Sequence, residues 1–234
     1  MFFFYQFLLF IIVLISPLII IFRLFKNKEH KKRFIEKFSL IKKNRPKGNL
    51  IWFHAASVGE LMSIIPLIQE LEKNKGIKTI LVTTSTLSSS KIFENFKFKK
   101  TIHQFFPIDF KYFTLRFLEY WQPKISIFID SEIWPCMFRE IKKKSIPLIL
   151  MNARITKKTF NRWKFFETFS RNTFEKIDIA YPSNIETFQY LKRLEIKKIK
   201  KIGNLKFTDS KNLNKKPLSK SFLLSLKRRL IWVA

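Results

Sequence analysis

Hydrophobic residues along the chain fall into two kinds of run, short continuous ones and longer ones with helical spacing. The short runs are apolar at almost every position, which is typical of strands covered on both faces. Between them, apolar residues recur every three or four positions, as from Leu61 to Leu71. Strands that alternate with helices predict a doubly wound parallel α/β sheet of the Rossmann-like kind. The predicted strands are Leu50–His54, Thr79–Thr83, His103–Phe106, Ile125–Asp130, Ile146–Met151, Ile177–Tyr181 and Ile199–Ile202, and further helices are expected at Phe110–Trp121, Pro135–Lys144 and Asn184–Leu194.

The start of the chain has a different pattern, because residues 2–22 form one apolar run without a charge. A helix of this length rises ~1.5 Å per residue and spans ~30 Å, the thickness of the hydrocarbon core of a bilayer. A cleaved signal peptide would carry basic residues ahead of its apolar run. Here they follow it, from Arg23 to Arg33. The run therefore predicts a membrane anchor, and the positive-inside rule places the rest of the chain in the cytoplasm. Pro17 leaves open whether the anchor spans the membrane or lies at its surface.

These patterns divide the chain into four segments. An anchor helix at 1–22 and a basic juxtamembrane segment at 23–48 precede a Rossmann-like domain at 49–211. The last segment, 212–234, has a polar linker containing Pro217 and ends on the apolar run Leu230–Ala234. We expect that run to be the first strand of a second domain that is missing here. The alternative is that it completes the edge of the first sheet.

Charge and composition narrow the function. The 46 Lys and Arg residues outnumber the 17 Asp and Glu, for a net charge of +29, although a bias towards Lys, Phe, Ile and Asn indicates that part of this charge is mutational. A positive surface favours anionic partners. Because the chain begins with a predicted membrane anchor, we expect anionic lipid of the inner membrane as the partner. No nucleic acid is expected, because the sequence shows no aromatic and basic platform or recognition helix. One cysteine and three histidines predict neither a disulfide framework nor a metal site. Neither GxGxxG nor GxxxxGK[ST] occurs, so no cofactor is expected.

Candidate chemistry lies where strand order reverses. In an open parallel sheet of order 3-2-1-4-5-6, ligands bind beyond the carboxyl ends of the first and fourth strands. The residues that leave these strands are His54-Ala55-Ala56-Ser57-Val58-Gly59-Glu60 and Asp130-Ser131-Glu132-Ile133-Trp134-Pro135. Topology therefore brings two carboxylates, Glu60 and Glu132, near one another. The helix dipole would lower the pKa of Glu60 and the neighbouring Glu132 would raise it. The structural alternative is a Glu that only satisfies the first amides of a helix.

Other polar residues also follow strands. Lys206 comes after the last predicted strand, and a solvated lysine is the default interpretation. Thr83-Thr84-Ser85-Thr86 would cap a helix or bind an oxyanion, with capping the stronger interpretation. Asn152-Ala153-Arg154 offers a guanidinium for phosphate or carboxylate. Cys136 is expected to be a buried structural thiol, since no base is placed to activate it.

Four segments, in this order, resemble the 3-deoxy-D-manno-octulosonic acid (Kdo) transferases of lipopolysaccharide synthesis. They are Trp52-Phe53-His54-Ala55-Ala56-Ser57-Val58-Gly59-Glu60, Ser131-Glu132-Ile133-Trp134-Pro135, Asn152-Ala153-Arg154 and Gly203-Asn204-Leu205-Lys206-Phe207. The resemblance implies the N-terminal half of a GT-B glycosyltransferase, without the C-terminal domain that holds most of the donor site. Thr208, where the family more often has Asp, is a small departure.

The resemblance also implies an activity. An inverting, metal-independent transferase would move Kdo from CMP-Kdo to a lipid A precursor (lipid IVA). Glu60 matches the general base, while Glu132 and Lys206 match positions that stabilise the transition state. Two alternatives stay open: a non-enzymatic, membrane-anchored basic domain that binds anionic lipid or nucleic acid, and a decayed remnant of the enzyme.

Overall fold

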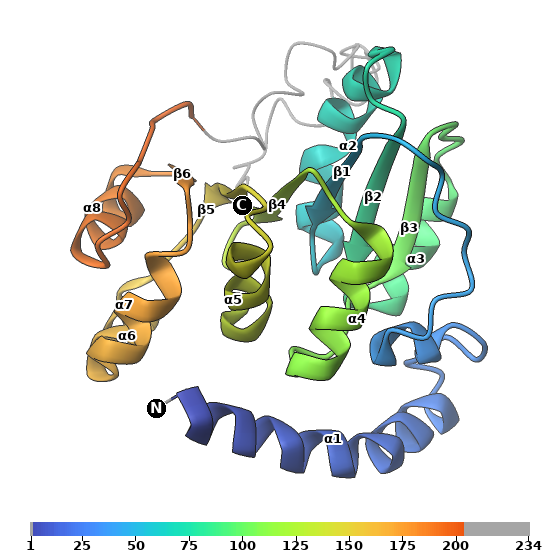
Figure 1. Cartoon of the computed structure of the whole chain (residues 1–234), viewed down its shortest axis with the longest axis horizontal. Coiled ribbons are helices and arrows are strands. Elements are labelled where there is room, and N and C mark those ends of the chain that lie inside the picture. The colour runs from blue at the N-terminus through green and yellow to red at the C-terminus, as the bar shows by residue number, and fades with distance from the viewer. Residues whose placement is uncertain (1, 204–234) are drawn as a thin grey trace, which may run out of the picture.

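A parallel sheet organises the chain. A computed structural model describes residues 2–203, and Figure 1 shows their arrangement. Six strands form one sheet in the order β3-β2-β1-β4-β5-β6, and every pairing between them is parallel. The predicted order 3-2-1-4-5-6 is therefore confirmed, with the switch point between β1 and β4. The strands are β1 (Leu50–His54), β2 (Thr79–Thr84), β3 (Thr101–Phe105), β4 (Ile125–Ile129), β5 (Leu148–Ala153) and β6 (Ile179–Pro182).

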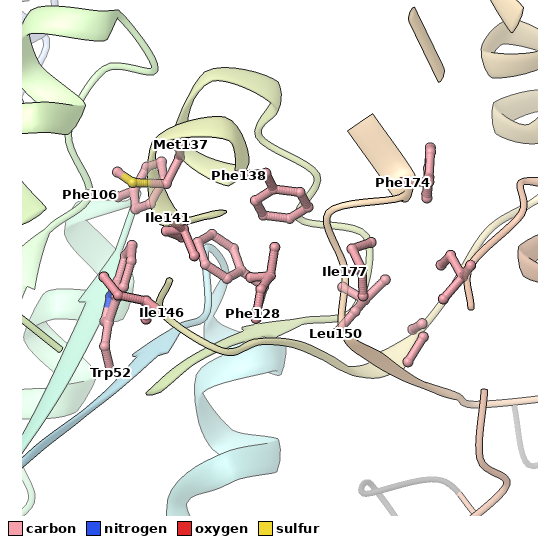
Figure 2. Packing of buried hydrophobic residues seen from close by; sticks show 14 of the residues in the cluster. Trp52, Phe106, Phe128, Met137, Phe138, Ile141, Ile146, Leu150, Phe174 and Ile177 are labelled. Carbon is pink, nitrogen blue, oxygen red and sulfur yellow. The ribbon is translucent and has the colours of Figure 1, made fainter. Parts of the chain in front are cut away.

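Helices cover both faces of this sheet. The helices that follow β1 and β2 pack on one face around Phe53 and Ile127, and the later helices pack on the other around Trp52 and Phe128. Adjacent residues of one strand are thus buried on opposite faces, which explains why the strands read as continuous apolar runs. Figure 2 shows the second cluster, where Trp52, Phe106 and Phe128 lie against Phe138 and Ile141. The helices of the domain are α2 (Val58–Lys73), α3 (Leu87–Glu94), α4 (Lys111–Trp121), α5 (Pro135–Lys143), α6 (Lys157–Phe165), α7 (Glu167–Phe174) and α8 (Ile185–Arg193).

The apolar run at the start of the chain forms one long helix, α1 (Phe2–Phe25), which extends past the predicted end at residue 22. It is long and apolar enough to cross a membrane, with a mean hydropathy of 2.9. In Figure 1 it lies lengthwise along the lower side of the domain, past α7, α5 and α4. A short 3₁₀ helix, η1 (Phe34–Phe38), then leads the chain towards β3.

Two parts of the fold differ from the expectation. The predicted strand Ile199–Ile202 is reduced to one isolated bridge, between Ile199 and Ala180, because the surrounding lysines leave few apolar side chains to bury. The segment between β5 and β6 contains two short helices, α6 and α7, which were not predicted because their apolar residues show no strong helical period. The predicted linker and final strand, 212–234, lie outside the described residues.

Candidate active site

The loops after β1 and β4 leave the sheet side by side. His54, the last residue of β1, pairs with Phe128 of β4, and the next residues of each strand continue beyond the same edge. Asp130 directly follows β4 with a positive φ of 61°, a conformation that Asp tolerates better than most residues. This turn sends the chain towards Glu132 and the start of α5. The sheet thus delivers both predicted carboxylates to one edge.

Glu60 lies in the first turn of α2 and bonds back to the residues that open the helix. One carboxylate oxygen, Oε2, accepts the backbone N–H of Ala56 at 2.8 Å, and Oε1 accepts the hydroxyl of Ser57 at 2.8 Å. Ser57 in turn caps the helix, since its Oγ accepts the backbone N–H of Glu60 at 3.3 Å. This is a close variant of a capping box. The structural role weighed for Glu60 is therefore real, and it also fixes the orientation of the carboxylate.

Electrostatics distinguish Glu60 from an ordinary helix-capping residue. Partial burial raises the pKa of its carboxyl, and the negative charge of Glu132 raises it further, with a smaller contribution from Asp130. The hydrogen bonds from Ser57 and Ala56 act in the opposite direction. The net shift is upward, towards the range where a carboxylate accepts a proton more readily near neutral pH. Burial and the neighbouring carboxylate therefore outweigh the hydrogen bonds from Ser57 and Ala56.

Glu132 is held by two aromatic donors. Its Oε2 accepts the indole N–H of Trp134 at 2.9 Å and lies 3.2 Å from Nε2 of His54. The carboxylate is partly exposed, with 17% of its side chain accessible, whereas the His54 ring is completely buried. Both bonds reach Oε2, so neither of them occupies the second carboxylate oxygen, Oε1. Glu132 is therefore oriented from its protein side while keeping access to solvent.

His54 is the site residue that carried no separate prediction. Its ring stacks on Phe106 with 3.8 Å between centroids, and its Nδ1 lies 3.0 Å from the hydroxyl of Thr83. Burial lowers the pKa of His54, against an opposing effect from Glu132, so the ring is neutral at physiological pH. A neutral ring that donates to Glu132 does so through Nε2–H, and Nδ1 then lies beside both the hydroxyl and the backbone O of Thr83, at 3.0 and 3.2 Å. The signal for it in the sequence is its place as the last residue of a buried strand, where apolar side chains are the rule.

The remaining candidates have separate places. Thr86 is the N-cap of α3 and accepts the backbone N–H of Ser89 at 3.1 Å, so capping by this segment is confirmed. Cys136 is fully buried and its pKa is raised to about 12 by burial, as expected of a structural thiol. Arg154 is exposed, and its backbone N–H donates to Asp130 O at 3.3 Å, beside the β4 loop. Lys206 lies outside the described residues. Within residues 2–203, no group of three or more His, Cys, Asp or Glu side chains could hold a metal ion.

A doubly wound parallel sheet with two oriented carboxylates at its switch point defines a ligand-binding domain of the Rossmann-like class. Residues 32–209 match the family model described as 3-deoxy-D-manno-octulosonic-acid transferase (kdotransferase). That match covers most of the chain and includes both carboxylates. The chain therefore belongs to the Kdo transferase family.

Individual relatives agree with this assignment. The chain is 39% identical over 188 residues to the 3-deoxy-D-manno-octulosonic acid transferase of Rickettsia prowazekii and 37% identical over 211 residues to that of Rickettsia bellii. It is also 40% identical over 152 residues to a probable mitochondrial 3-deoxy-D-manno-octulosonic acid transferase of Arabidopsis thaliana. These alignments cover 78%, 88% and 64% of this chain. They cover only 40%, 49% and 34% of the relatives, so the chain spans half or less of their length.

Proposed function

We propose that this chain provides the acceptor half of a Kdo transferase, which moves Kdo from CMP-Kdo to a lipid A precursor such as lipid IVA. The observation that supports it best is the pair of carboxylates at the switch point, with Glu60 raised in pKa beside Glu132. A transferase of this kind needs one base to make a sugar hydroxyl nucleophilic. Glu60 has the position and the pKa shift for that task.

In the proposed reaction, the acceptor hydroxyl oxygen attacks the anomeric carbon of Kdo as Glu60 takes its proton. The bond from that carbon to the CMP phosphate oxygen breaks, and CMP leaves with the electron pair. One displacement inverts the anomeric configuration. No metal is required, because CMP is a good leaving group and cationic side chains such as Lys206 would stabilise the charge that develops on it.

The surrounding residues have supporting roles in this proposal. Glu132, fixed by Trp134 and His54, keeps the pKa of Glu60 high and would stabilise positive charge at the anomeric centre. Ser57 holds Glu60 at 2.8 Å through its hydroxyl and keeps the carboxylate facing the loop. The main binding site for CMP-Kdo is proposed to lie on residues outside this domain.

Membrane attachment forms part of the proposal. A lipid A precursor is a membrane lipid with phosphate groups, and α1 followed by basic residues would bring the domain to it. We propose that the domain is attached by α1 to the inner membrane and faces the cytoplasm, an orientation that the excess of Lys and Arg after residue 22 favours.

The test is transfer of Kdo in native membranes that contain this protein. Glu60→Gln keeps the shape of the side chain and removes its basicity, so transfer is expected to fall by a factor of about 100 or more. Glu70→Gln is the matched control, because Glu70 lies on the same helix, is 71% exposed and pairs with the exposed Lys73. Normal transfer by Glu60→Gln would overturn the assignment of the base. Membranes of the unaltered protein that transfer no Kdo would overturn the activity itself.

A further inference from the structure

The polar residues of α1 all lie on the stripe that faces the domain. Residues that are buried or half-buried recur every three or four positions along this helix, at 2, 5, 6, 9, 13, 16, 20, 23 and 24. Tyr5, Gln6 and Ser16, the polar residues of its apolar part, belong to this stripe. The outer side of α1 is apolar and exposed along its whole length, from Phe3 to Phe25. In the docked position, the helix turns its polar stripe to the domain and leaves its apolar side exposed.

The first half of α1 is fixed to the starts of α4 and α5. The Tyr5 hydroxyl donates to Oδ2 of Asp109 at 2.7 Å, and Asp109 also accepts the backbone N–H groups of Cys136 and Met137, at 3.0 and 2.7 Å. Asp109 is almost completely buried, with 2% of its surface exposed. Arg139, one turn further along α5, lies 4.2 Å from the ring centroid of Phe2. The amino-terminal turn of α1 thus contacts the domain through a buried polar network.

The last turn of α1 is fixed to the domain through the segment that follows it, which includes η1. Arg23 bonds to Glu29 at 3.1 Å, and Glu29 also accepts the ammonium group of Lys37 at 2.7 Å. Glu29 is buried, and Lys37 belongs to η1. The backbone O of Lys37 accepts the N–H of Ile108, and Glu36 accepts the backbone N–H of Phe105 at 2.8 Å. Both ends of α1 are therefore tied to one rigid body.

We infer that α1 lies in the plane of the membrane surface, as an in-plane helix docked on the domain, rather than across the bilayer. From Tyr5 to Arg23, α1 runs about 27 Å at 1.5 Å per residue. A spanning helix would carry Tyr5 to the far side of the hydrocarbon core and away from Asp109. A charged domain cannot follow it, because its exposed polar groups would lose their water. The in-plane arrangement keeps every contact and still gives the outer apolar face to lipid.

The partner of this face is a lipid surface with anionic head groups. Contiguous apolar exposure on this scale is rare on monomeric proteins that stay in water. Basic residues flank it: Lys26, Lys28, Lys31 and Lys32 are exposed just after α1, and Lys111 and Arg139 line a cavity of about 570 Å³ between α1 and α4. The other walls of this cavity are mainly Phe side chains from α1 and Phe110. Cations above an apolar floor suit a phosphate head group with its acyl chain.

A depth profile tests the orientation directly. Positions 4, 11, 18 and 25 are spaced by seven residues and lie on the outer face, where Phe4, Ile11, Leu18 and Phe25 are exposed. Each is changed singly to Cys in the Cys136→Ser background, labelled with an environment-sensitive fluorophore and bound to phosphatidylethanolamine vesicles containing phosphatidylglycerol. Lipids with quenchers at known depths then locate each label. We expect the same shallow depth at all four positions.

Cross-linking provides an independent readout of docking. Phe2→Cys with Arg139→Cys, also in the Cys136→Ser background, is expected to form an intramolecular cross-link with a short bismaleimide on the vesicles as well as in detergent. Phe4→Cys with Arg139→Cys is the control, because Phe4 lies on the outer face and its cross-link yield is expected to be at least fivefold lower.

The outcomes separate this inference from the membrane attachment on which it rests. Failure of the unaltered protein to float with the anionic vesicles would overturn both. Flotation with labels at positions 11 and 18 deep in the hydrocarbon, and at 4 and 25 near opposite surfaces, would overturn the in-plane arrangement alone. Loss of the Phe2→Cys cross-link on vesicles would do the same.

Discussion

Two helices at the same edge of the sheet, α2 and α5, both begin beside a carboxylate, yet the two carboxylates differ in almost every other respect. Asp109, which precedes α4 and contacts the first turn of α5, is buried, and among the described residues it bonds to Tyr5 and to two backbone N–H groups. Glu60, at the start of α2, is only partly buried, and the charge of a second carboxylate, Glu132, raises its pKa. Both stabilise a helix terminus, but only Glu60 remains accessible to a substrate.

The neighbours of the two groups distinguish a structural carboxylate from a candidate base. Burial raises the pKa of both groups, that of Asp109 to about 7, so a raised pKa alone does not identify the site. The difference lies in the neighbours. Asp109 is surrounded by donors that satisfy it, whereas the pKa of Glu60 is raised in part by the like charge of Glu132, which has no structural benefit. Such a pair is better explained by chemistry.

The largest effect is expected at the structural carboxylate. Asp109→Ala removes the acceptor of the Tyr5 hydroxyl and of two buried N–H groups, which is expected to cost about 3 kcal/mol of unfolding free energy. Urea denaturation in mild detergent measures it. Glu60→Gln is the comparison and is expected to lose less than about 1 kcal/mol, because it keeps one acceptor oxygen. Equal losses would contradict the division of roles.

The pH dependence of stability separates the same two carboxylates. The pKa of Asp109 is about 7 in the folded protein and near 3.8 unfolded, so only the folded state holds this proton between pH 4 and 7. Its contribution to the free energy of unfolding therefore falls as pH rises through this window and is lost above pH 7.

Asp109→Asn removes that contribution and serves as the measurement. Buried His54 and His103, whose pKa values are lowered, act in the opposite direction, since below pH 6.5 only the unfolded state gains their protons. The difference between the unaltered protein and Asp109→Asn cancels them. We expect this difference to decline from pH 4 to 7, and a flat difference would show that Asp109 is ionised throughout.

A smaller effect is expected at the cap of α2. Ser57→Ala removes the side chain that accepts the N–H of Glu60 and donates to its carboxylate, and is expected to cost about 1 kcal/mol. Thermal unfolding measures the loss, with Ser63→Ala as the matched change within the same helix, where the Ser63 hydroxyl bonds only to the backbone O of Glu60. A loss no larger than that of Ser63→Ala would contradict the capping role.

The subtlest prediction concerns the coupling between Glu60 and Glu132. Glu132→Gln removes a like charge, so the pKa of Glu60 is expected to fall, whereas Ser57→Ala is expected to raise it by removing a hydrogen bond to the ionised form. Carbon-detected NMR titration of the Glu60 carboxyl follows both changes. An unaltered pKa in Glu132→Gln would mean that Glu132 does not contribute to the shift.

Much of the site could be predicted from the sequence because the signals are local. The small residues after β1 and the pattern from Ser57 to Glu60 predict a turn and a capped helix after a strand. The strand order then predicts that Glu132 lies near them. His54 could not be given its role in this way. Its function depends on Phe106, Thr83 and Glu132, which come from three other segments of the chain.

The alternation of strands and helices and the apolar character of α1 follow from hydrophobic periodicity alone, and the order of the sheet is the one common in doubly wound folds. How α1 contacts the domain depends instead on long-range packing. Tyr5 of its polar stripe bonds to Asp109, which lies more than a hundred residues away in the sequence. No local pattern predicts that partner. The different roles of Asp109 and Glu60 also depend on long-range packing, because burial and neighbouring charge are properties of the packed domain and not of the residue.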